Sequence, residues 1–122
     1  MNSIFLNLSN HPHEKWDQSQ RKAACVHADE IQDFQFPEVS PESSTREIED
    51  LAGEISAQIP EPTTHAMVMG EFTLTFALVR EFQKRNVSCL AATNRREIIE
   101  ESEGKKTALF RFIQFREYPS LV

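Results

Sequence analysis

The sequence predicts an α/β fold, a Rossmann-like three-layer sandwich whose mainly parallel sheet ends in an antiparallel C-terminal edge strand. Short apolar runs alternate with amphipathic helical segments along the chain, which is typical of parallel strands joined by helices. The last two apolar runs flank a polar hairpin, so the final strand is expected to be antiparallel. The 122 residues, 39% of them hydrophobic, suffice for one core but not for two. We therefore predict a single domain over residues 1–122, with helices on both faces of the sheet.

The chain opens with a predicted strand and helix. The apolar run "SIFLNLS" indicates a buried strand that ends near Leu8, and "NHPH" indicates a turn. Residues 13–28 are then expected to form one helix, with Trp16, Ala23 and Val26 on one side.

A second strand and helix follow. "EIQDFQFP" alternates between apolar and polar residues and ends at Pro37, as a strand does. Ser44 and Glu47 have the spacing of a capping box, and the helix they begin is ended by Pro60. Its apolar face is formed by Ile48, Leu51, Ala52, Ile55 and Ile59.

The second half of the chain continues the alternation. "HAMVMG" predicts a third strand, "EFTLTFALVREFQKRN" a third helix and "VSCLAAT" a fourth strand. A polar hairpin tip at residues 100–106 leads into a last strand at residues 109–115. The inner stripe of the third helix is expected to hold Phe72, Phe76, Val79 and Phe82.

Composition excludes several classes of protein. A net charge of −6 argues against duplex nucleic acid as a partner, because non-specific binding requires a basic surface. Residues 1–60 carry four Lys/Arg against eleven Asp/Glu, and residues 61–122 carry nine Lys/Arg against eight Asp/Glu. The charge of the second half therefore does not exclude a local basic pocket there.

No apolar stretch approaches the ~20 residues of a membrane span, and the N-terminus lacks the features of a secretory signal. We expect a cytoplasmic protein that does not bind membranes.

The two cysteines suggest neither zinc nor a disulfide. Cys25 and Cys89 lie in unlike segments and form no C-x-x-C pair. We expect two reduced, largely buried thiols.

Polar residues follow three of the predicted strands. In an open sheet of this kind, ligands bind beyond the carboxyl ends of the strands, where the strand order reverses. We therefore expect these residues to meet at one edge of the sheet. They are Ser9, Asn10 and His11 after the first strand, Gly70, Glu71, Phe72 and Thr73 after the third, and Thr93, Asn94, Arg95 and Arg96 after the fourth.

Gly70 begins the segment of greatest interest. A glycine at a strand-to-helix turn permits close approach of a ligand, and the helix N-terminus favours an anion such as phosphate. Thr73, Arg95 and Arg96 could complete such a cradle. In the alternative interpretation Gly70 only makes the turn, Thr73 caps the helix and the arginines are solvated. For Glu71 a capping role is favoured over that of a base or ribose ligand.

Familiar cofactor and metal motifs are not recognised. The segment after Gly70 lacks the second glycine and the lysine that dinucleotide and triphosphate loops require, so we expect no cofactor. His11 and His13 have no Cys, Asp or Glu cluster beside them at ligand spacing, and we expect no metal site. A histidine at this edge is either a general acid or base or simply solvated.

Five segments resemble landmarks of small stand-alone CRISPR-associated proteins. They are "NLSNH" followed by Trp16, then "FQFP", "VMGEFTLTF", "LAATNRRE" and "FRFIQFREY". The group is related to CRISPR-associated Rossmann-fold (CARF) sensor domains of type III CRISPR antiviral defence. The resemblance implies a homodimer that binds a cyclic oligoadenylate second messenger, and single-domain members resemble ring nucleases that degrade it.

The resemblance also implies roles for individual residues. It assigns catalysis to Asn10, His11, Thr73 and Arg95. It assigns ligand binding to Ser9, Gly70, Glu71, Phe72, Thr75, Thr93, Asn94 and Arg96. Cleavage of cyclic tetra-adenylate would need no metal, because the substrate's own 2′-hydroxyl attacks the phosphate while the protein aligns it and stabilises charge. A sensor or sequestering protein that binds the ligand without cutting it, and an unrelated protein-interaction domain, are the alternatives.

Overall fold

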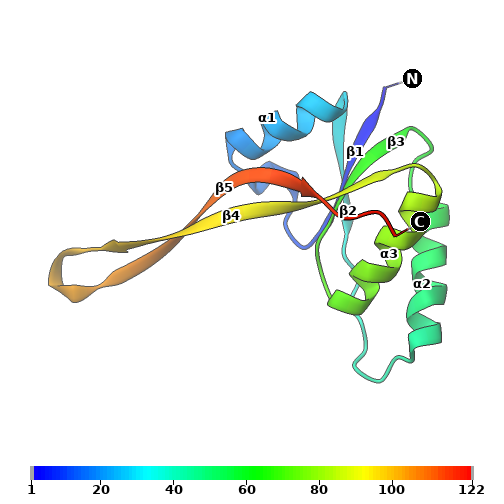
Figure 1. The fold of residues 1–122 in the computed structure, drawn as a ribbon. Helices are drawn as coiled ribbons and strands as arrows, with labels where there is room; N and C mark the ends of the chain where they lie inside the picture. Colours follow the sequence, from blue (N-terminus) through cyan, green and yellow to red (C-terminus); the bar gives the residue numbers. More distant parts are fainter. Residues whose placement is uncertain (1, 122) are drawn as a thin grey trace.

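A five-stranded sheet in the order β2-β1-β3-β4-β5 organises the computed structural model, which describes residues 2–121 (Figure 1). Strands β1 to β4 run parallel, and β5 is antiparallel to β4. The predicted Rossmann-like α/β sandwich is confirmed. The strands are β1 (Ile4–Ser9), β2 (Glu30–Gln35), β3 (Thr63–Val68), β4 (Ser88–Glu100) and β5 (Lys106–Glu117).

Three α-helices cover the two faces of the sheet (Figure 1). Helix α1 packs over one face, and α2 and α3 pack side by side over the other. The predicted capping box begins α2, since Ser44 Oγ accepts from the Glu47 N–H and the Glu47 carboxylate accepts from the Ser44 N–H. The helices are α1 (Gln18–His27), α2 (Thr45–Gln58) and α3 (Phe72–Lys84), with single 3₁₀ turns η1 (His13–Lys15) and η2 (Ser102–Gly104).

Two clusters of buried side chains form the core. The larger lies between the sheet and α2 and α3, and includes Leu6, Ala52 and Phe82. The smaller lies beneath α1 and joins Phe5, Trp16, Ala24, Ala28, Met67 and Leu90. The site described below is built on the smaller cluster.

The expected helix over residues 13–28 is wrong in its first part. The backbone is extended at Trp16 and Asp17, and Asp17 Oδ1 accepts from the Gln20 N–H at 2.9 Å, so α1 begins at Gln18. Val26 was expected on the same side as Trp16, but Trp16 is buried whereas Val26 is 83% exposed. Ala24 and Ala28 turn toward the sheet instead.

Helix α3 has a different inner stripe from the predicted one. Val79 and Phe82 are buried as expected, but Phe72 is 89% exposed and Phe76 is 58% exposed. Leu74 and Leu78 occupy the inner face, together with Phe82. The spacing 74, 78, 82 is as helical as the predicted one, so periodicity alone did not discriminate between the two stripes.

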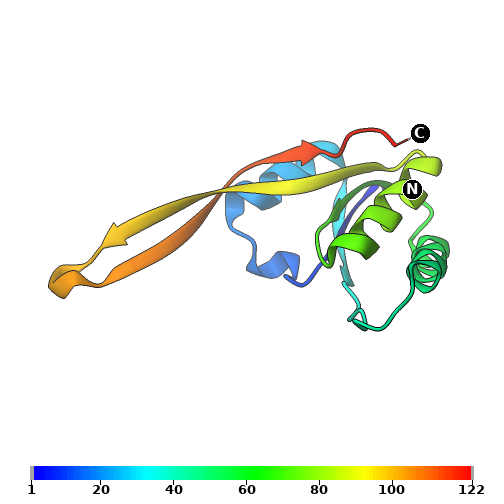
Figure 2. The ribbon, with the colours of Figure 1, turned by 60° about the horizontal axis from the view of Figure 1, so that its bottom comes forward.

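Strands β4 and β5 are much longer than predicted and leave the body as a two-stranded ribbon (Figures 1 and 2). β4 pairs with β3 only over Ser88–Leu90, and beyond that point its partner is β5 alone. The polar hairpin tip expected at residues 100–106 is confirmed, with Glu103 and Gly104 at positive φ. Residues 93–96 are therefore not at the end of a strand but in its middle.

The two cysteines differ. Cys89 is buried, and burial, with a smaller contribution from the Glu117 carboxylate, raises the pKa of its thiol to about 12. Cys25 is exposed, so its expected burial is wrong. Among the helices of residues 2–121, none has the length and apolar character needed to cross a membrane.

Candidate functional site

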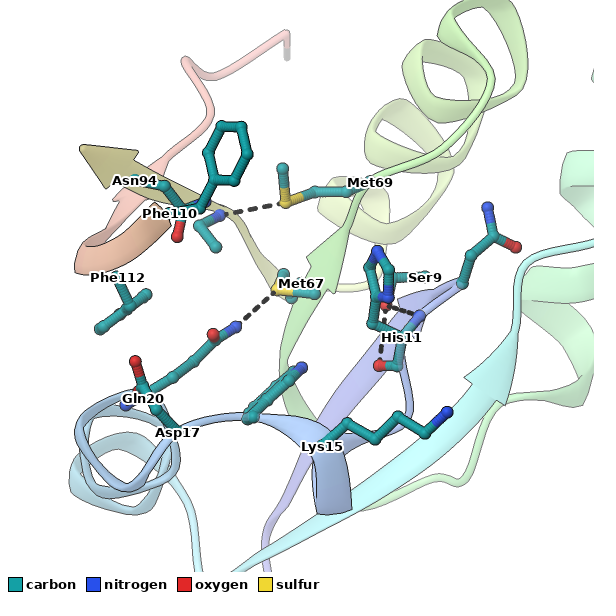
Figure 3. A pocket seen from close by; sticks show the side chains of 13 residues that line it. Ser9, His11, Lys15, Asp17, Gln20, Met67, Met69, Asn94, Phe110 and Phe112 are labelled. Carbon is teal, nitrogen blue, oxygen red and sulfur yellow. Dashed lines mark hydrogen bonds between the residues drawn. The ribbon is translucent and has the colours of Figure 1, made fainter. Parts of the chain in front are cut away.

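A pocket of about 660 Å³ opens at the carboxyl ends of β1 and β3, between the start of α1 and the base of the β4–β5 hairpin (Figure 3). We call it the strand-end pocket. Its β1 side is formed by Ser9, Asn10 and His11, and its helical side by Lys15, Trp16, Asp17 and Gln20. Met67 and Met69 lie between these sides, and Ala92, Asn94, Phe110 and Phe112 close the hairpin side.

The topology explains why the pocket is here. The strand order reverses between β1 and β3, since β2 lies beyond β1 and β4 beyond β3. Connections on the two sides of such a point leave in opposite directions and open a crevice. The early separation of β4 from β3 after Leu90 widens it.

A buried hydrogen-bond network shapes the β1 side. Asn7 is only 1% exposed, and its Nδ2 donates to the His11 carbonyl at 2.7 Å and to Asp33 Oδ1 at 2.9 Å. Ser9 Oγ donates to Asn7 Oδ1 at 2.7 Å and accepts from the His11 N–H at 3.2 Å. The turn after β1 is thereby fixed, and Asn10 and His11 keep exposed side chains on the pocket rim.

Asp33 joins this network to His13. Its Oδ1 accepts from the His13 N–H at 3.0 Å and lies 3.0 Å from His13 Nδ1. Burial by itself would raise the pKa of Asp33, but the hydrogen bonds from Asn7 and His13 together outweigh it and lower the pKa. Asp33 therefore stays ionised and holds His13 away from the pocket lining, leaving His11 as the histidine of the site.

Two residues of this network, Asn7 and Asp33, were not predicted from the sequence. All six residues of β1 are buried, so an asparagine within this run must find hydrogen-bond partners in the interior. The run "IFLNLS" therefore indicates that Asn7 needs such a partner. It does not identify Asp33 on β2 as that partner.

The start of α3 is occupied by the protein's own carboxylate. Glu71 Oε1 accepts from the Leu74 N–H at 2.7 Å, and the Thr73 hydroxyl donates to the two Glu71 carboxylate oxygens at 2.6 and 2.9 Å. These bonds, that from Thr73 first, lower the pKa of Glu71. The favoured capping role of Glu71 is confirmed, and the helix N-terminus expected to hold a phosphate already carries an anion.

Gly70 serves a close contact within the protein. A Cβ at this position would lie 2.4 Å from the Phe36 ring, which is buried in the larger cluster. The Gly70 N–H donates to the Thr75 hydroxyl at 3.1 Å, and Thr75 is itself buried. Neither Gly70 nor Thr75 lines the strand-end pocket.

Phe72 and Thr73 line a second hollow, on the face covered by α2 and α3. It has a volume of about 470 Å³, and Phe76 and Arg80 line it as well. The residues expected after the third strand are thus directed away from those after the first.

The residues of the fourth strand are also divided. Asn94 lines the strand-end pocket, whereas the Thr93 hydroxyl donates to the Gln114 carbonyl at 3.0 Å. Arg96 pairs with Phe110 across the ribbon and Arg95 with Arg111, so the two arginines lie on opposite faces of it. Neither lines the pocket.

The structure therefore brings together Ser9, Asn10, His11 and Asn94, and separates Thr73 and Arg95 from them. It adds an apolar lining from Trp16, Met67, Met69 and Phe110. Phe110 is 69% exposed, because the ribbon carries it beyond the helices. Among residues 2–121, no group of three or more His, Cys, Asp or Glu side chains is placed to hold a metal ion.

Comparison with known proteins identifies a family, but the description of that family states no activity. The family model described as "Uncharacterized protein MJ1673 family" matches residues 3–116, which include the pocket and the whole hairpin. No curated protein and no solved structure matches the chain.

Proposed function

The chain belongs to the Uncharacterized protein MJ1673 family, and we propose that its strand-end pocket binds a cyclic oligoadenylate, with cyclic tetra-adenylate as the first candidate, and cleaves it without a metal. The observation that carries the proposal is the composition of the pocket. An apolar interior of Trp16, Met67 and Met69 lies beside a polar rim that includes Asn10, His11 and Lys15. A nucleotide has the same division, since its base is flat and weakly polar and its ribose and phosphate are strongly polar.

The proposed cleavage needs little from the protein beyond alignment and charge. The substrate's 2′-oxygen attacks the adjacent phosphorus, the bond from phosphorus to the 5′-oxygen breaks, and the proton lost by the 2′-hydroxyl is balanced by one gained at the 5′-oxygen. The products are a 2′,3′-cyclic phosphate and a 5′-hydroxyl on one linear chain. His11 supplies a proton-transfer group at the rim, Asn10 a hydrogen-bond partner and Lys15 a positive charge for the phosphate.

The assignment of catalytic residues is narrower than the one the resemblance implies. Thr73 donates to Glu71, and Arg95 lies on the ribbon face opposite to Phe110. Of the four catalytic residues that the resemblance implies, the proposal therefore keeps Asn10 and His11 within one copy of the chain. Arg96, on the same ribbon face as Phe110, lies beyond the pocket and is available to an extended ligand.

Incubation of the protein with cyclic tetra-adenylate and a chelator, followed by chromatography, tests the proposal. We expect linear oligoadenylate to accumulate, and His11→Ala to lower the rate by about 10²–10⁴-fold, the usual contribution of a proton-transfer group. His27→Ala is the matched control, because His27 is an exposed histidine at the far end of α1. It is expected to keep the parent rate.

Three outcomes separate the alternatives. Ligand that binds but stays intact during long incubation with excess protein would identify a sensor or sequestering protein. Absence of both binding and cleavage would contradict the proposal altogether and favour a protein-interaction domain. Cleavage that His11→Ala leaves unchanged would move the chemistry to other residues.

A homodimer is part of the proposal. A cyclic tetranucleotide has rotational symmetry that a two-fold dimer can match, and the pocket of one copy is open on one side. The ribbon offers exposed apolar side chains at Ile98, Phe110 and Ile113, and an isolated two-stranded ribbon is only marginally stable without a partner.

The oligomeric state is measured by sedimentation velocity. We expect a dimer for the parent, and a shift toward monomer for Ile98→Asp, because a buried charge opposes association. Val26→Asp is the control, since Val26 is also apolar and exposed but lies on α1. A parent that sediments as a monomer with bound ligand would refute the dimer.

A further inference from the structure

Two hydrogen-bond donors in the strand-end pocket face methionine sulfurs. The Ala92 N–H donates to Met69 Sδ at 3.2 Å, and Gln20 Nε2 donates to Met67 Sδ at 3.7 Å (Figure 3). A thioether is a weak acceptor. Both donors therefore gain if a ligand presents a nitrogen or oxygen acceptor in place of the sulfur.

The first of these donors is exposed by the fold itself. In a continued parallel ladder, β3 would pair with β4 beyond Leu90, but the pairing stops at Met67 and Leu90. The Ala92 N–H is therefore left on the open side of β4, at a position that the backbone fixes. A backbone N–H can only donate a hydrogen bond. A side-chain amide, by contrast, can turn over and present its carbonyl oxygen, an acceptor, in place of its NH₂ group.

The surrounding side chains suit a flat ring. Met67 and Met69 are soft and polarisable, and methionine makes favourable contacts with aromatic rings. Trp16 is buried beside them, and Phe110 stands exposed on the hairpin side of the pocket. A planar heteroaromatic ring between these groups would bury apolar surface and present its edge to the two donors.

We infer that this part of the pocket is an adenine-reading subsite, in which the Ala92 N–H donates to a ring nitrogen and the Gln20 amide pairs with the neighbouring edge of the base. The inference rests on the proposed function and names the part of the ligand that the pocket recognises. Adenine presents an unprotonated N1 and an unprotonated N7 on either side of its exocyclic amine, so the Gln20 Nε2 donates to N7 while the Gln20 carbonyl accepts from the amine. Guanine carries a hydrogen at N1, which opposes the fixed Ala92 donor.

Trp16 provides the measurement, because it is the only tryptophan of the chain and lines the pocket. We expect AMP to change its fluorescence at concentrations about tenfold lower than GMP or CMP, the effect of one well-placed hydrogen bond on affinity. Gln20→Leu is expected to weaken AMP binding about tenfold and to reduce its preference over GMP. Gln32→Leu is the control, since Gln32 is exposed on β2 and does not line the pocket.

The outcomes distinguish this inference from the proposed function. Equal affinity for AMP and GMP, or an unchanged affinity of Gln20→Leu, overturns the adenine subsite even if cyclic tetra-adenylate is bound and cut. Selective AMP binding without any binding of cyclic tetra-adenylate supports the subsite and overturns the proposed function. If AMP gives no signal, the affinity of Gln20→Leu for cyclic tetra-adenylate decides, and an unchanged value overturns the subsite.

Discussion

Replacement of Gly70 by alanine is expected to lower the free energy of unfolding by about 3 kcal/mol, at the upper end of the usual cost of overpacking a core. The added Cβ would lie 2.4–2.5 Å from three atoms of the Phe36 ring. Phe36 is 4% exposed and is held in the larger core cluster, so the ring has little room to withdraw. Urea denaturation of the variant and the parent measures the difference.

Two further variants test this explanation. Gly53 lies within α2, and a Cβ there would meet nothing within 4 Å, so Gly53→Ala should stabilise the protein by about 0.5–1 kcal/mol through helix propensity. Phe36→Leu combined with Gly70→Ala should recover part of the lost stability, because it removes ring atoms from the contact. A Gly70→Ala variant of normal stability that had lost ligand binding would instead return Gly70 to the ligand site.

Asn7→Ala is expected to destabilise the protein by about 3 kcal/mol. Asn7 is the centre of the network at the end of β1, and its loss removes one hydrogen bond each from Ser9 Oγ, the His11 carbonyl and Asp33 Oδ1. Ser9 Oγ can then donate only to the His11 carbonyl, at 3.3 Å, and Asp33 Oδ1 keeps only its bonds with His13. Because this network holds the turn that carries Asn10 and His11, ligand affinity should fall as well. Urea denaturation and ligand titration measure the two effects.

The dependence of the free energy of unfolding on acidic pH is a second test of the effect of Asn7→Ala. The pKa of Asp33 is lowered in the folded protein. Ionised Asp33 therefore contributes to the free energy of unfolding above the pKa of the unfolded chain, about 3.9, and this contribution is lost as the pH falls through the pKa of the folded protein. Without Asn7 the pKa is lowered less, and Asn7→Ala should lose less stability on acidification than the parent.

Asn10→Ala is the control for the two measurements of stability. Asn10 is exposed, and its side chain accepts from the exposed Gln35 amide at 3.0 Å, so the stability of Asn10→Ala should be within about 0.5 kcal/mol of the parent. Equal stability of Asn7→Ala and Asn10→Ala would contradict the structural role given to Asn7.

Local sequence patterns predicted the position of a site residue only where that position depends on residues close along the chain. "SNH" after the first strand was placed at the pocket correctly, because the strand ends where its apolar run ends and the carboxyl ends of parallel strands share one edge. "TNRR" was not, because the end of β4 depends on pairing with β5, and an edge ribbon continues as long as its partner does. Gln20 and Phe110 gave no signal, since a glutamine within a helix and a phenylalanine within a strand are ordinary by pattern.

The sequence by itself determined the order of strands and helices, the capping of α2 and of α3, and the hairpin tip at residues 100–106, because each depends on contacts between residues close along the chain. Tertiary structure alone decided that Phe36 fills the space at Gly70 and that β4 leaves β3 at Leu90. These features depend on which surfaces meet across the sheet. They divide the expected single cluster of polar residues into a pocket beneath α1 and a separate hollow between α2 and α3.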